Sequence, residues 1–360
     1  MNKYNIGFII SGLRDGGAER VITNLARMYS ERGHKTIVIT FSRGCDEYPL
    51  PESTIRYVLN EPTLNKVGIF AKIQRYARLR EICKKENLDV LVAFIGGAIT
   101  YGILATACSS TKCVISVRND PQTIYPGLFN RVFSKWFLSK ANGAVFQTRD
   151  AQNWFPIKLQ KKSTIIFNPL HPCFYDIQCS PEADLVITCG RLKRQKNQQL
   201  LIESFNDVVK EIPSARLNIY GEGPLEKELL SLIKKYSLEN NVFLEGRISD
   251  VPSVLAKASL FVLSSDIEGA PNALMEAMAA GVPCVSTDCP CGGPKMLLGQ
   301  NERGLLVGVN DKNGMAKAII KMLKDQLLRE RFIIASKHYS ENFKEESIFT
   351  AWDYFINRIL

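Results

Sequence analysis

Short apolar runs that end in glycine-containing loops and lead into helical patterns recur along this chain. The first run covers residues 4–10 and its loop covers 11–17, after which apolar residues follow at helical spacing. In the other half of the chain, the apolar run 185–188 leads through the loop 189–197 into another helical pattern. Such strand–loop–helix units build open parallel sheets with helices on both faces. We therefore predict an α/β fold with two Rossmann-like, doubly wound domains.

The length of 360 residues also fits two domains. Asn168 and Pro169 begin an irregular segment marked by prolines, which is typical of a connection between domains. The predicted parts are an N-terminal domain over residues 1–168, a linker over 169–183 and a C-terminal domain over 184–342. We expect a last helix, over 343–360, to pack on the N-terminal domain.

The composition is that of a globular protein, with 46% hydrophobic residues. No apolar run approaches the roughly 20 residues that a membrane-spanning helix needs. The N-terminal residues enter a strand pattern without the layout of a signal peptide, so we expect a cytoplasmic protein. Its ten cysteines are scattered and are expected to be reduced. The densest group is Cys284, Cys289 and Cys291, but no histidine accompanies it, which favours a plain loop over a metal site.

The net charge of +10 is unevenly distributed along the sequence. Residues 1–170 contain 24 Lys and Arg against 12 Asp and Glu, whereas the remainder contains 22 against 24. This asymmetry indicates that the first half meets an anionic partner, namely a membrane surface, a nucleic acid or a phosphorylated acceptor. The alternative is that these are ordinary surface charges that keep the protein soluble.

Two segments of the first half have the pattern of cationic amphipathic helices, which bind bilayer surfaces. Residues 66–85 carry one apolar stripe that is largely surrounded by Lys and Arg. In residues 125–140 the apolar positions at helical spacing are Phe129, Val132, Phe133, Trp136 and Phe137. The alternative is that each stripe packs on the sheet while the basic side faces water. We favour packing for 66–85, and both interpretations stay open for 125–140.

The segment 264–287 is the first candidate for a ligand site. An apolar run ends there in a loop that contains Glu268, and a short helix over 272–280 contains Glu276. Asn272 suits the N-cap of this helix and Gly281 suits the position after its end. A helix N-terminus favours an anion, while carboxylates accept hydrogen bonds from hydroxyl groups. A sugar nucleotide carries both phosphate and hydroxyl groups and fits this arrangement.

A loop with four cations at the end of a predicted strand is the second candidate. Of these cations, Arg191 and Lys196 are predicted to bind a diphosphate, and Lys193 and Arg194 are expected to face solvent. In the first half of the chain, the pair Gly16-Gly17 precedes a predicted helix, where the backbone can approach a phosphate or a sugar closely. A tight turn explains this glycine pair equally well.

Several groups of residues, in this order along the chain, resemble landmarks of one family. They are Gly16-Gly17-Ala18-Glu19-Arg20, Gly190-Arg191-Leu192 with Gln195-Lys196-Asn197, Gly221-Glu222-Gly223-Pro224, Glu268-Gly269-x-Pro271-Asn272 with Glu276-Ala277-Met278, and Gly304-Leu305-Leu306-Val307. Together they resemble the family 4 retaining glycosyltransferases of the GT-B architecture, especially the bacterial enzymes of capsule, exopolysaccharide and lipopolysaccharide synthesis. This resemblance implies two Rossmann-like domains, with the nucleotide sugar held mainly by the C-terminal one.

The resemblance also implies roles for individual residues. Arg191 and Lys196 neutralise the donor diphosphate, Glu268 lies by the transferred sugar, and Glu276 accepts from the ribose hydroxyls. Backbone amides of residues 270–273 face the phosphates, and the segment 246–250 lies near the base. The residues implied at the donor are Gly16, Gly17, Arg191, Lys196, Ile248, Glu268, Gly269, Ala270, Asn272, Ala273 and Glu276, with Glu268, Arg191 and Lys196 as the catalytic ones.

The chemistry implied by the resemblance is metal-independent transfer of a hexose or N-acetylhexosamine with retention, and the absence of a DxD motif agrees with it. UDP is the expected nucleotide on family frequency. The acceptor would be lipid-linked or part of a lipopolysaccharide core, at the inner face of the cell membrane. Many family members have an N-terminal-domain histidine that is absent from the matching stretch 116–121. There we expect Arg118 or Asn119 to contact the sugar or acceptor, the alternative being a simple turn.

Two other classes of protein share parts of this pattern. A nucleotide-sugar 2-epimerase of GT-B fold would need further acid and base groups, and a chain with three histidines offers few of them. A basic nucleic-acid-binding protein would carry its charge on a recognisable binding element, and the sequence has none. A glycosyltransferase is therefore the leading hypothesis.

Overall fold

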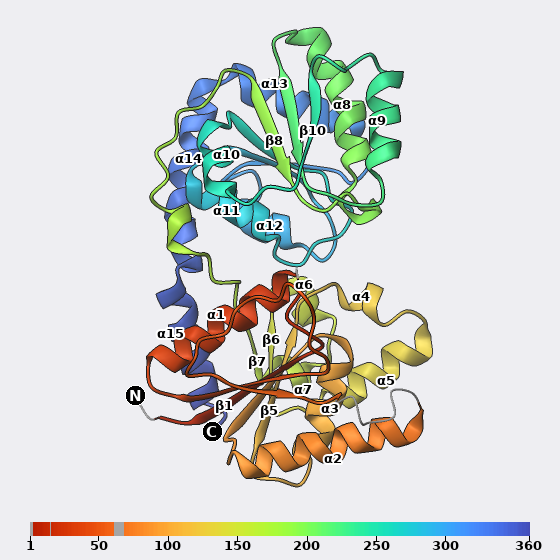
Figure 1. Cartoon of the computed structure of the whole chain (residues 1–360). Helices are drawn as coiled ribbons and strands as arrows, with labels where there is room; N and C mark the ends of the chain where they lie inside the picture. The colour runs from red at the N-terminus through yellow and green to blue at the C-terminus, as the bar shows by residue number, and fades with distance from the viewer. Residues whose placement is uncertain (1–2, 15, 61–67) are drawn as a thin grey trace. The chain divides into compact units, whose positions relative to one another are not determined.

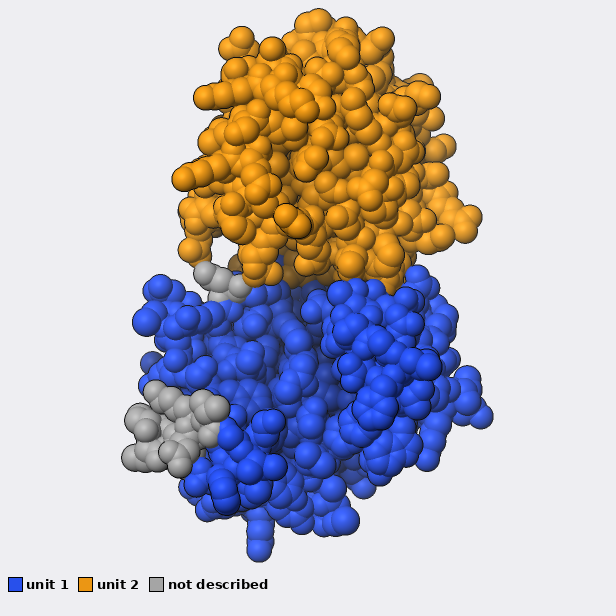
Figure 2. All heavy atoms as spheres, turned by 90° about the vertical axis from the view of Figure 1, so that its right-hand side faces the viewer, with its two compact units in different colours: residues 1–169, 345–360 blue, residues 170–344 orange. Residues whose placement is uncertain are grey.

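The computed structural model describes residues 3–14, 16–60 and 68–360 (Figure 1). The chain divides into two compact units, which Figure 2 distinguishes by colour. Unit 1 comprises residues 1–169 together with 345–360, and unit 2 comprises residues 170–344. Each unit contains a parallel β-sheet of its own, so the predicted pair of doubly wound α/β domains is confirmed.

Unit 1 is built on a seven-stranded sheet with the strand order β3-β2-β1-β4-β5-β6-β7. Its strands are β1 (Asn5–Ile10), β2 (Lys35–Thr40), β3 (Ile55–Val58), β4 (Val90–Phe94), β5 (Lys112–Val117), β6 (Gly143–Phe146) and β7 (Ser163–Ile165). Its helices are α1 (Gly17–Glu31), α2 (Ile69–Lys85), α3 (Gly96–Thr106), α4 (Pro121–Ile124), α5 (Leu128–Leu138), α6 (Arg149–Asn153), α7 (Ile157–Gln160) and α15 (Glu345–Asn357).

Helix α3 begins at a pair of glycines, Gly96 and Gly97. This helix forms because Ala98, Ile99 and Ile103 are buried in it, so packing outweighs the weak helix propensity of glycine. The beginning of the amphipathic segment predicted at residues 66–85 lies outside the described residues, and α2 is described from Ile69 onward.

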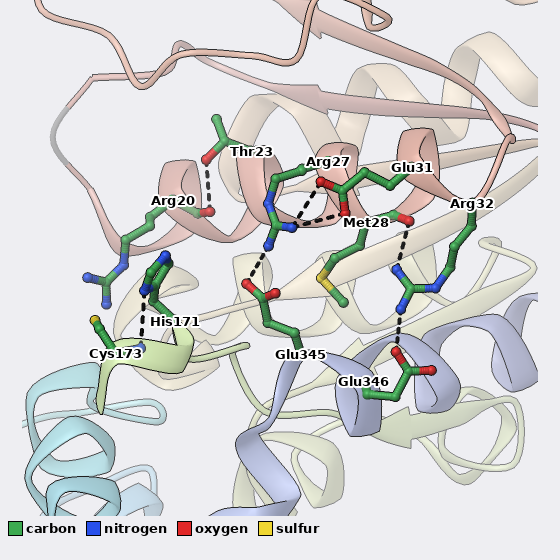
Figure 3. Close-up of polar contacts among 10 residues, drawn as sticks. All are labelled: Arg20, Thr23, Arg27, Met28, Glu31, Arg32, His171, Cys173, Glu345 and Glu346. Atoms are coloured by element: carbon green, nitrogen blue, oxygen red, sulfur yellow. Dashed lines mark hydrogen bonds and ion pairs between the residues drawn. The ribbon is translucent and has the colours of Figure 1, made fainter. Parts of the chain in front are cut away.

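The last helix, α15, is part of the core of unit 1. Its residues Phe349 and Trp352 are fully buried among side chains of α1 and the central strands. Close to its start, Glu345 pairs with Arg27 of α1, and Glu346 pairs with Arg32 (Figure 3). Exposed ion pairs contribute only about 0–1 kcal/mol each, so the buried rings hold most of this helix in place. The helix predicted at residues 343–360 thus belongs to the same unit as the N-terminal strands.

Replacing Trp352 tests how strongly α15 stabilises unit 1. We expect Trp352→Ala to lower the free energy of unfolding by about 3–5 kcal/mol, because it leaves a cavity against the ring of Phe94. Tyr354→Ala in the same helix is the matched control, since Tyr354 is 66% exposed. Urea unfolding followed by circular dichroism measures both variants. Equal stability of the two variants would contradict a structural role of α15.

Unit 2 is built on a six-stranded sheet with the order β10-β9-β8-β11-β12-β13. Its strands are β8 (Leu185–Cys189), β9 (Arg216–Tyr220), β10 (Val242–Gly246), β11 (Leu260–Leu263), β12 (Cys284–Thr287) and β13 (Leu305–Val307). Its helices are α8 (Gln198–Glu211), α9 (Glu226–Lys235), α10 (Val251–Lys257), α11 (Asn272–Ala280), α12 (Gly293–Leu298), α13 (Lys312–Lys324) and α14 (Gln326–Ser340), with 3₁₀ turns at Pro172–Phe174, Arg194–Lys196 and Glu341–Phe343.

Of the linker predicted at residues 169–183, residues 170–183 group with unit 2 and Pro169 groups with unit 1. The linker backbone is bound to unit 2, because the N–H groups of Ser180 and Glu182 donate to the carbonyls of Ala256 and Lys257 at 2.8 Å. Backbone hydrogen bonds of this kind are not apparent from a proline-marked irregular sequence.

Among the helices that the structure describes, none is long and apolar enough to cross a membrane.

Candidate active site

The loops that carry the predicted cations and the first carboxylate follow neighbouring strands of unit 2. Strands β8 and β11 pair in parallel, and the strand order reverses between them. Ligands of open α/β sheets bind outside the carboxyl ends of the strands at such a reversal. The loop 190–197 after β8 and the loop 264–271 after β11 therefore meet at this edge of the sheet.

Lys196 and Glu268 contact each other, although 72 residues separate them in the sequence. The Lys196 Nζ lies 2.6 Å from Oε1 of Glu268, and the hydroxyl of Ser265 donates to the same oxygen at 2.7 Å. The Glu268 side chain is 9% exposed and that of Lys196 is 23% exposed. A nearly buried carboxylate thus has a cation and a hydroxyl as partners on one oxygen.

Further hydrogen bonds join the two loops around this ion pair. The Gln195 side chain donates to the carbonyl of Ile267 at 2.8 Å, and the Asp266 N–H donates to the carbonyl of Gln195 at 2.9 Å. Asn197 donates from Nδ2 to Oδ1 of Asp266 at 2.6 Å, and its own Oδ1 caps α8. The positions of Lys196 and Glu268 are therefore set by contacts on both sides of each residue.

A third loop, between β12 and α12, supports the backbone of Glu268. The Glu268 N–H donates to the carbonyl of Pro290 at 2.7 Å, and the Cys291 N–H donates to the carbonyl of Glu268 at 3.0 Å. Cys289 and Cys291 are buried, and burial raises the pKa of the Cys289 thiol to about 12. The Cys289 thiol is therefore protonated and packs as a small apolar group. Among the residues that the structure describes, no cluster of three side chains suits a metal ion.

Glycines allow the loops of this edge to pack backbone against backbone. A Cβ on Gly221 would lie 2.0 Å from the carbonyl oxygen of Gly190, and one on Gly293 would lie 1.5 Å from that of Gly269. Real Cβ atoms do not approach backbone oxygens so closely, so only glycine fits these positions. The landmark glycines Gly190, Gly221 and Gly269 thus lie where neighbouring loops meet.

Arg191 is exposed, but its backbone is held by flanking hydrogen bonds. The N–H of Gly190 donates to the carbonyl of Tyr220, and the N–H of Leu192 donates to that of Glu222, both at 2.9 Å. The Arg191 carbonyl accepts from Nε2 of Gln198 at 3.1 Å. The guanidinium can therefore reach a ligand from an anchored position. Lys193 and Arg194 are also exposed, as we expected from the sequence.

Helix α11 occupies the predicted range, but its cap differs from the prediction. Asn272 is the first helical residue, and the N-cap is Pro271, whose extended backbone leads into the helix without a side-chain hydrogen bond. Gly281 has a φ of +80° and ends the helix as expected. Glu276 is 5% exposed. The pKa of the Cys189 thiol, at the end of β8, is raised mainly by burial of that thiol and in part by the negative charge of Glu276. This carboxylate therefore also lies at the carboxyl edge of the sheet.

The other predicted donor residues of unit 2 lie in loops or in the first turn of α11 at the same edge. Gly269 and Ala270 precede α11, and Ala273 follows Asn272 in its first turn. Ile248 is half-buried in the segment after β10. That segment is attached to the glycine loop after β9, because the Gly221 N–H donates to the Gly246 carbonyl at 2.7 Å.

In unit 1, Gly16 caps α1 and Gly17 is its first residue, whereas Asp15 of the same loop lies outside the described residues. Arg118 points into the core instead of toward a ligand. It donates to Ser116 Oγ at 2.7 Å and to Asn168 Oδ1 at 2.6 Å, and its guanidinium lies 4.8 Å from the centre of the Phe94 ring. Burial lowers its pKa to about 9. Of the two residues predicted to contact the sugar or acceptor, only Asn119 is exposed.

Comparison with known proteins identifies the family. The model described as Glycosyl transferases group 1 matches residues 178–339, and the model described as Glycosyltransferase Family 4 matches residues 15–170. The chain is a family 4 glycosyltransferase of the GT-B fold. The resemblance inferred from the sequence motifs is therefore confirmed.

The glycosyltransferase has curated relatives that it matches over nearly their full length. It is 28% identical to the N-acetylgalactosamine-N,N'-diacetylbacillosaminyl-diphospho-undecaprenol 4-alpha-N-acetylgalactosaminyltransferase of Campylobacter jejuni, over 95% of this chain and 96% of that protein. It is 26% identical to a second Campylobacter jejuni enzyme, the GalNAc-alpha-(1->4)-GalNAc-alpha-(1->3)-diNAcBac-PP-undecaprenol alpha-1,4-N-acetyl-D-galactosaminyltransferase, with 96% of each chain covered. The crystal structure of Anabaena HepE in complex with UDP has the same fold, with a TM-score of 0.83 at 18% identity, over 98% of this chain and all of that one.

Three residues that help to build the loop edge of this glycosyltransferase were not predicted from the sequence. Ser265 lies in the candidate segment 264–287 without an assigned role, and its hydroxyl donates to Glu268. The carbonyl of Pro290 accepts from the Glu268 N–H, and Gly293 packs on the backbone of Gly269. The only sequence signal for these contacts was the concentration of glycine and proline after β12.

Proposed function

We propose that this glycosyltransferase transfers a hexose or N-acetylhexosamine from a UDP-sugar to a lipid-linked saccharide, with retention and without a metal ion. The observation that carries the proposal is the contact between Lys196 and Glu268 at the reversal of the strand order. A cation and a carboxylate at one place match the two chemical parts of the donor, its diphosphate and its sugar hydroxyls. The UDP in the Anabaena HepE structure and the undecaprenol-linked acceptors named for the Campylobacter enzymes support the choice of substrates.

In the proposed reaction, Lys196 and Arg191 act on the leaving diphosphate. Negative charge grows on its oxygen as the bond to the sugar breaks, so cations there stabilise the transition state more than the ground state. Glu268 already accepts two hydrogen bonds on Oε1, which leaves Oε2 to accept from a sugar hydroxyl. We assign Glu276 to the ribose hydroxyls and the backbone of residues 270–273 to the phosphates. The segment that contains Ile248 would hold the base, and Gly16-Gly17 of unit 1 would also approach the donor.

In this proposal the reaction takes place at the inner face of the cell membrane, because the acceptor is lipid-linked. Unit 1, which carries the excess positive charge of the sequence, would bind the acceptor and the anionic lipid around it. Asn119 is an exposed candidate for acceptor or sugar contact, while Arg118 keeps a structural role in the core. No nucleic acid takes part.

Incubation of the enzyme with labelled nucleotide sugars and membrane lipids tests the proposal. We expect label from one UDP-sugar to enter the lipid fraction at a rate that EDTA does not change, because cations of the protein neutralise the diphosphate. The anomeric configuration of the product, measured by NMR, should match that of the donor. Conversion of the free nucleotide sugar to its 2-epimer without lipid labelling would show an epimerase instead. Inhibition by EDTA that added metal reverses would refute metal independence.

A further inference from the structure

Helix α5 exposes most of its large apolar side chains. Its exposed fractions are 80% for Leu128, 80% for Phe129, 60% for Val132, 49% for Phe133 and 59% for Trp136. Only Ser134 and Leu138 of this helix are buried. The sequence left open whether this stripe packs on the sheet, and the structure shows that it faces outward. Contiguous apolar surface of this kind marks a site of interaction.

The exposed aromatic rings of α5 form an ordered row. The rings of Phe129 and Phe133 stack at 6.3 Å with an interplanar angle of 8°, and those of Phe133 and Phe137 stack at 5.7 Å with 5°. Trp136 lies beside this row, 6.0 Å from Phe133. Because the rings are already in place, little side-chain freedom would be lost when a partner covers them.

The charged residues between positions 121 and 149 of the sequence are all basic. Lys140 Nζ lies 4.2 Å from the centre of the Trp136 ring, and Lys135 Nζ lies 4.5 Å from that of Trp154. The sequence contains no Asp or Glu between Asp120 and Asp150. In total, unit 1 contains 25 Lys and Arg against 15 Asp and Glu, whereas unit 2 contains 21 of each. The partner of α5 must therefore combine apolar and anionic groups.

Helix α2 differs from α5 in how it is packed. Its later residues Leu79, Ile82 and Cys83 are buried, as we favoured from the sequence, but Ile69 and Phe70 in its first turn are 69% and 74% exposed. Helix α3 contacts both α2 and α5. The first turn of α2 is thus a second apolar and cation-flanked element of unit 1.

We propose that α5 is the element that docks this enzyme on an anionic lipid bilayer, with Phe129, Phe133 and Trp136 inserted at the interface. The inference rests on the proposed lipid-linked acceptor and identifies the surface that reaches it. At about 1.5 Å per residue the helix is roughly 16 Å long, too short to span a bilayer, so it lies in the interface plane. Arg131, Lys135 and Lys140 bind the headgroups around it.

A second copy of the chain fits this surface less well than lipid. In a two-fold dimer through α5, the same patch faces itself, and Arg131, Lys135 and Lys140 of both copies would approach each other. No carboxylate on the helix would offset this repulsion. An anionic bilayer provides the apolar and the negative groups together.

Vesicle flotation of the full-length protein tests the docking surface without donor or acceptor. We expect binding to phosphatidylglycerol-containing vesicles, and little binding to pure phosphatidylcholine. The variant Phe129→Ser/Phe133→Ser/Trp136→Ser should bind more than about tenfold less tightly. Leu327→Ser/Ile334→Ser in α14 of unit 2 is the matched control, since these residues are 79% and 73% exposed, and it should bind like the wild type.

Two further measurements separate insertion from other outcomes. Brominated lipid should quench the fluorescence of Trp136 in the wild type, and Trp136→Phe should bind normally but lose that quenching. Light scattering measures the oligomeric state. If the wild type forms a dimer that the triple variant disrupts, and does not bind vesicles, the proposal is overturned. Equal vesicle binding by the wild type and the triple variant would also overturn it. Since vesicle binding needs no substrate, these results do not depend on whether the proposed sugar transfer is correct.

Discussion

Glu268→Ala and Arg191→Ala should each abolish sugar transfer while leaving the protein folded. Removing one fixed group that stabilises transition-state charge typically costs about 10²–10³ in kcat. Glu268→Ala should cost at least as much, because it also leaves Lys196 without its carboxylate partner. Initial rates of transfer, with thermal unfolding of each variant as the test of folding, measure the effect.

Lys193→Ala is the control for Arg191→Ala, because Lys193 is an exposed cation of the same loop that we assigned to solvent. Glu268→Gln is the control for Glu268→Ala, since it keeps the shape and the acceptor oxygen but removes the charge. We expect Lys193→Ala to retain nearly full activity and Glu268→Gln to remain impaired. Turnover of Arg191→Ala or Glu268→Ala at the wild-type rate would refute the assigned site.

Gly293→Ala should impair both stability and activity, although the residue bears no side chain. Its new Cβ would lie 1.5 Å from the carbonyl oxygen of Gly269, which follows Glu268 directly. One of two backbone segments must therefore move, at a cost of about 1–3 kcal/mol for overpacking. Because the moved segment carries Glu268, we expect transfer to fall by at least about tenfold, as ångström-scale misplacement commonly does.

Gly308→Ala provides the matched control for this backbone prediction. Gly308 follows β13 in the same sheet, and a Cβ there would lie 3.5 Å from Cβ of Asp311, which is ordinary contact. Thermal unfolding and the transfer assay compare the two variants. If Gly293→Ala retained the stability and rate of Gly308→Ala, the close approach of the two loops would not matter for the site.

The sequence was sufficient to predict the edge of the sheet where the candidate residues lie. Parallel strands place all their carboxyl ends together, so loops containing Arg191, Lys196 and Glu268 had to share one edge. The actual contact of Lys196 with Glu268 depends on β8 and β11 being neighbours. Strand order is a property of the whole sheet, and no local pattern specifies it.

Side-chain direction was the main property that the sequence did not reveal. Arg118 or Asn119 was expected to contact the sugar or acceptor, with a simple turn as the alternative, but the Arg118 side chain donates to Ser116 and Asn168 in the core. Likewise, the sequence left open whether the aromatic stripe of α5 packs on the sheet, and the structure shows that it faces outward. Both outcomes depend on which elements lie next to a residue in space, and helical or strand periodicity does not contain that information.

The place of α15 also has a consequence for the order in which the protein folds during synthesis. Residues 170–344 leave the ribosome before residues 345–360, so unit 2 has all of its chain available while unit 1 still lacks α15. Until then Tyr4, whose hydroxyl donates to Asp353 at 2.6 Å, and the Phe94 ring have no partners from that helix. Unit 1, whose N-terminal residues are synthesised first, is thus the unit whose last residues are synthesised last.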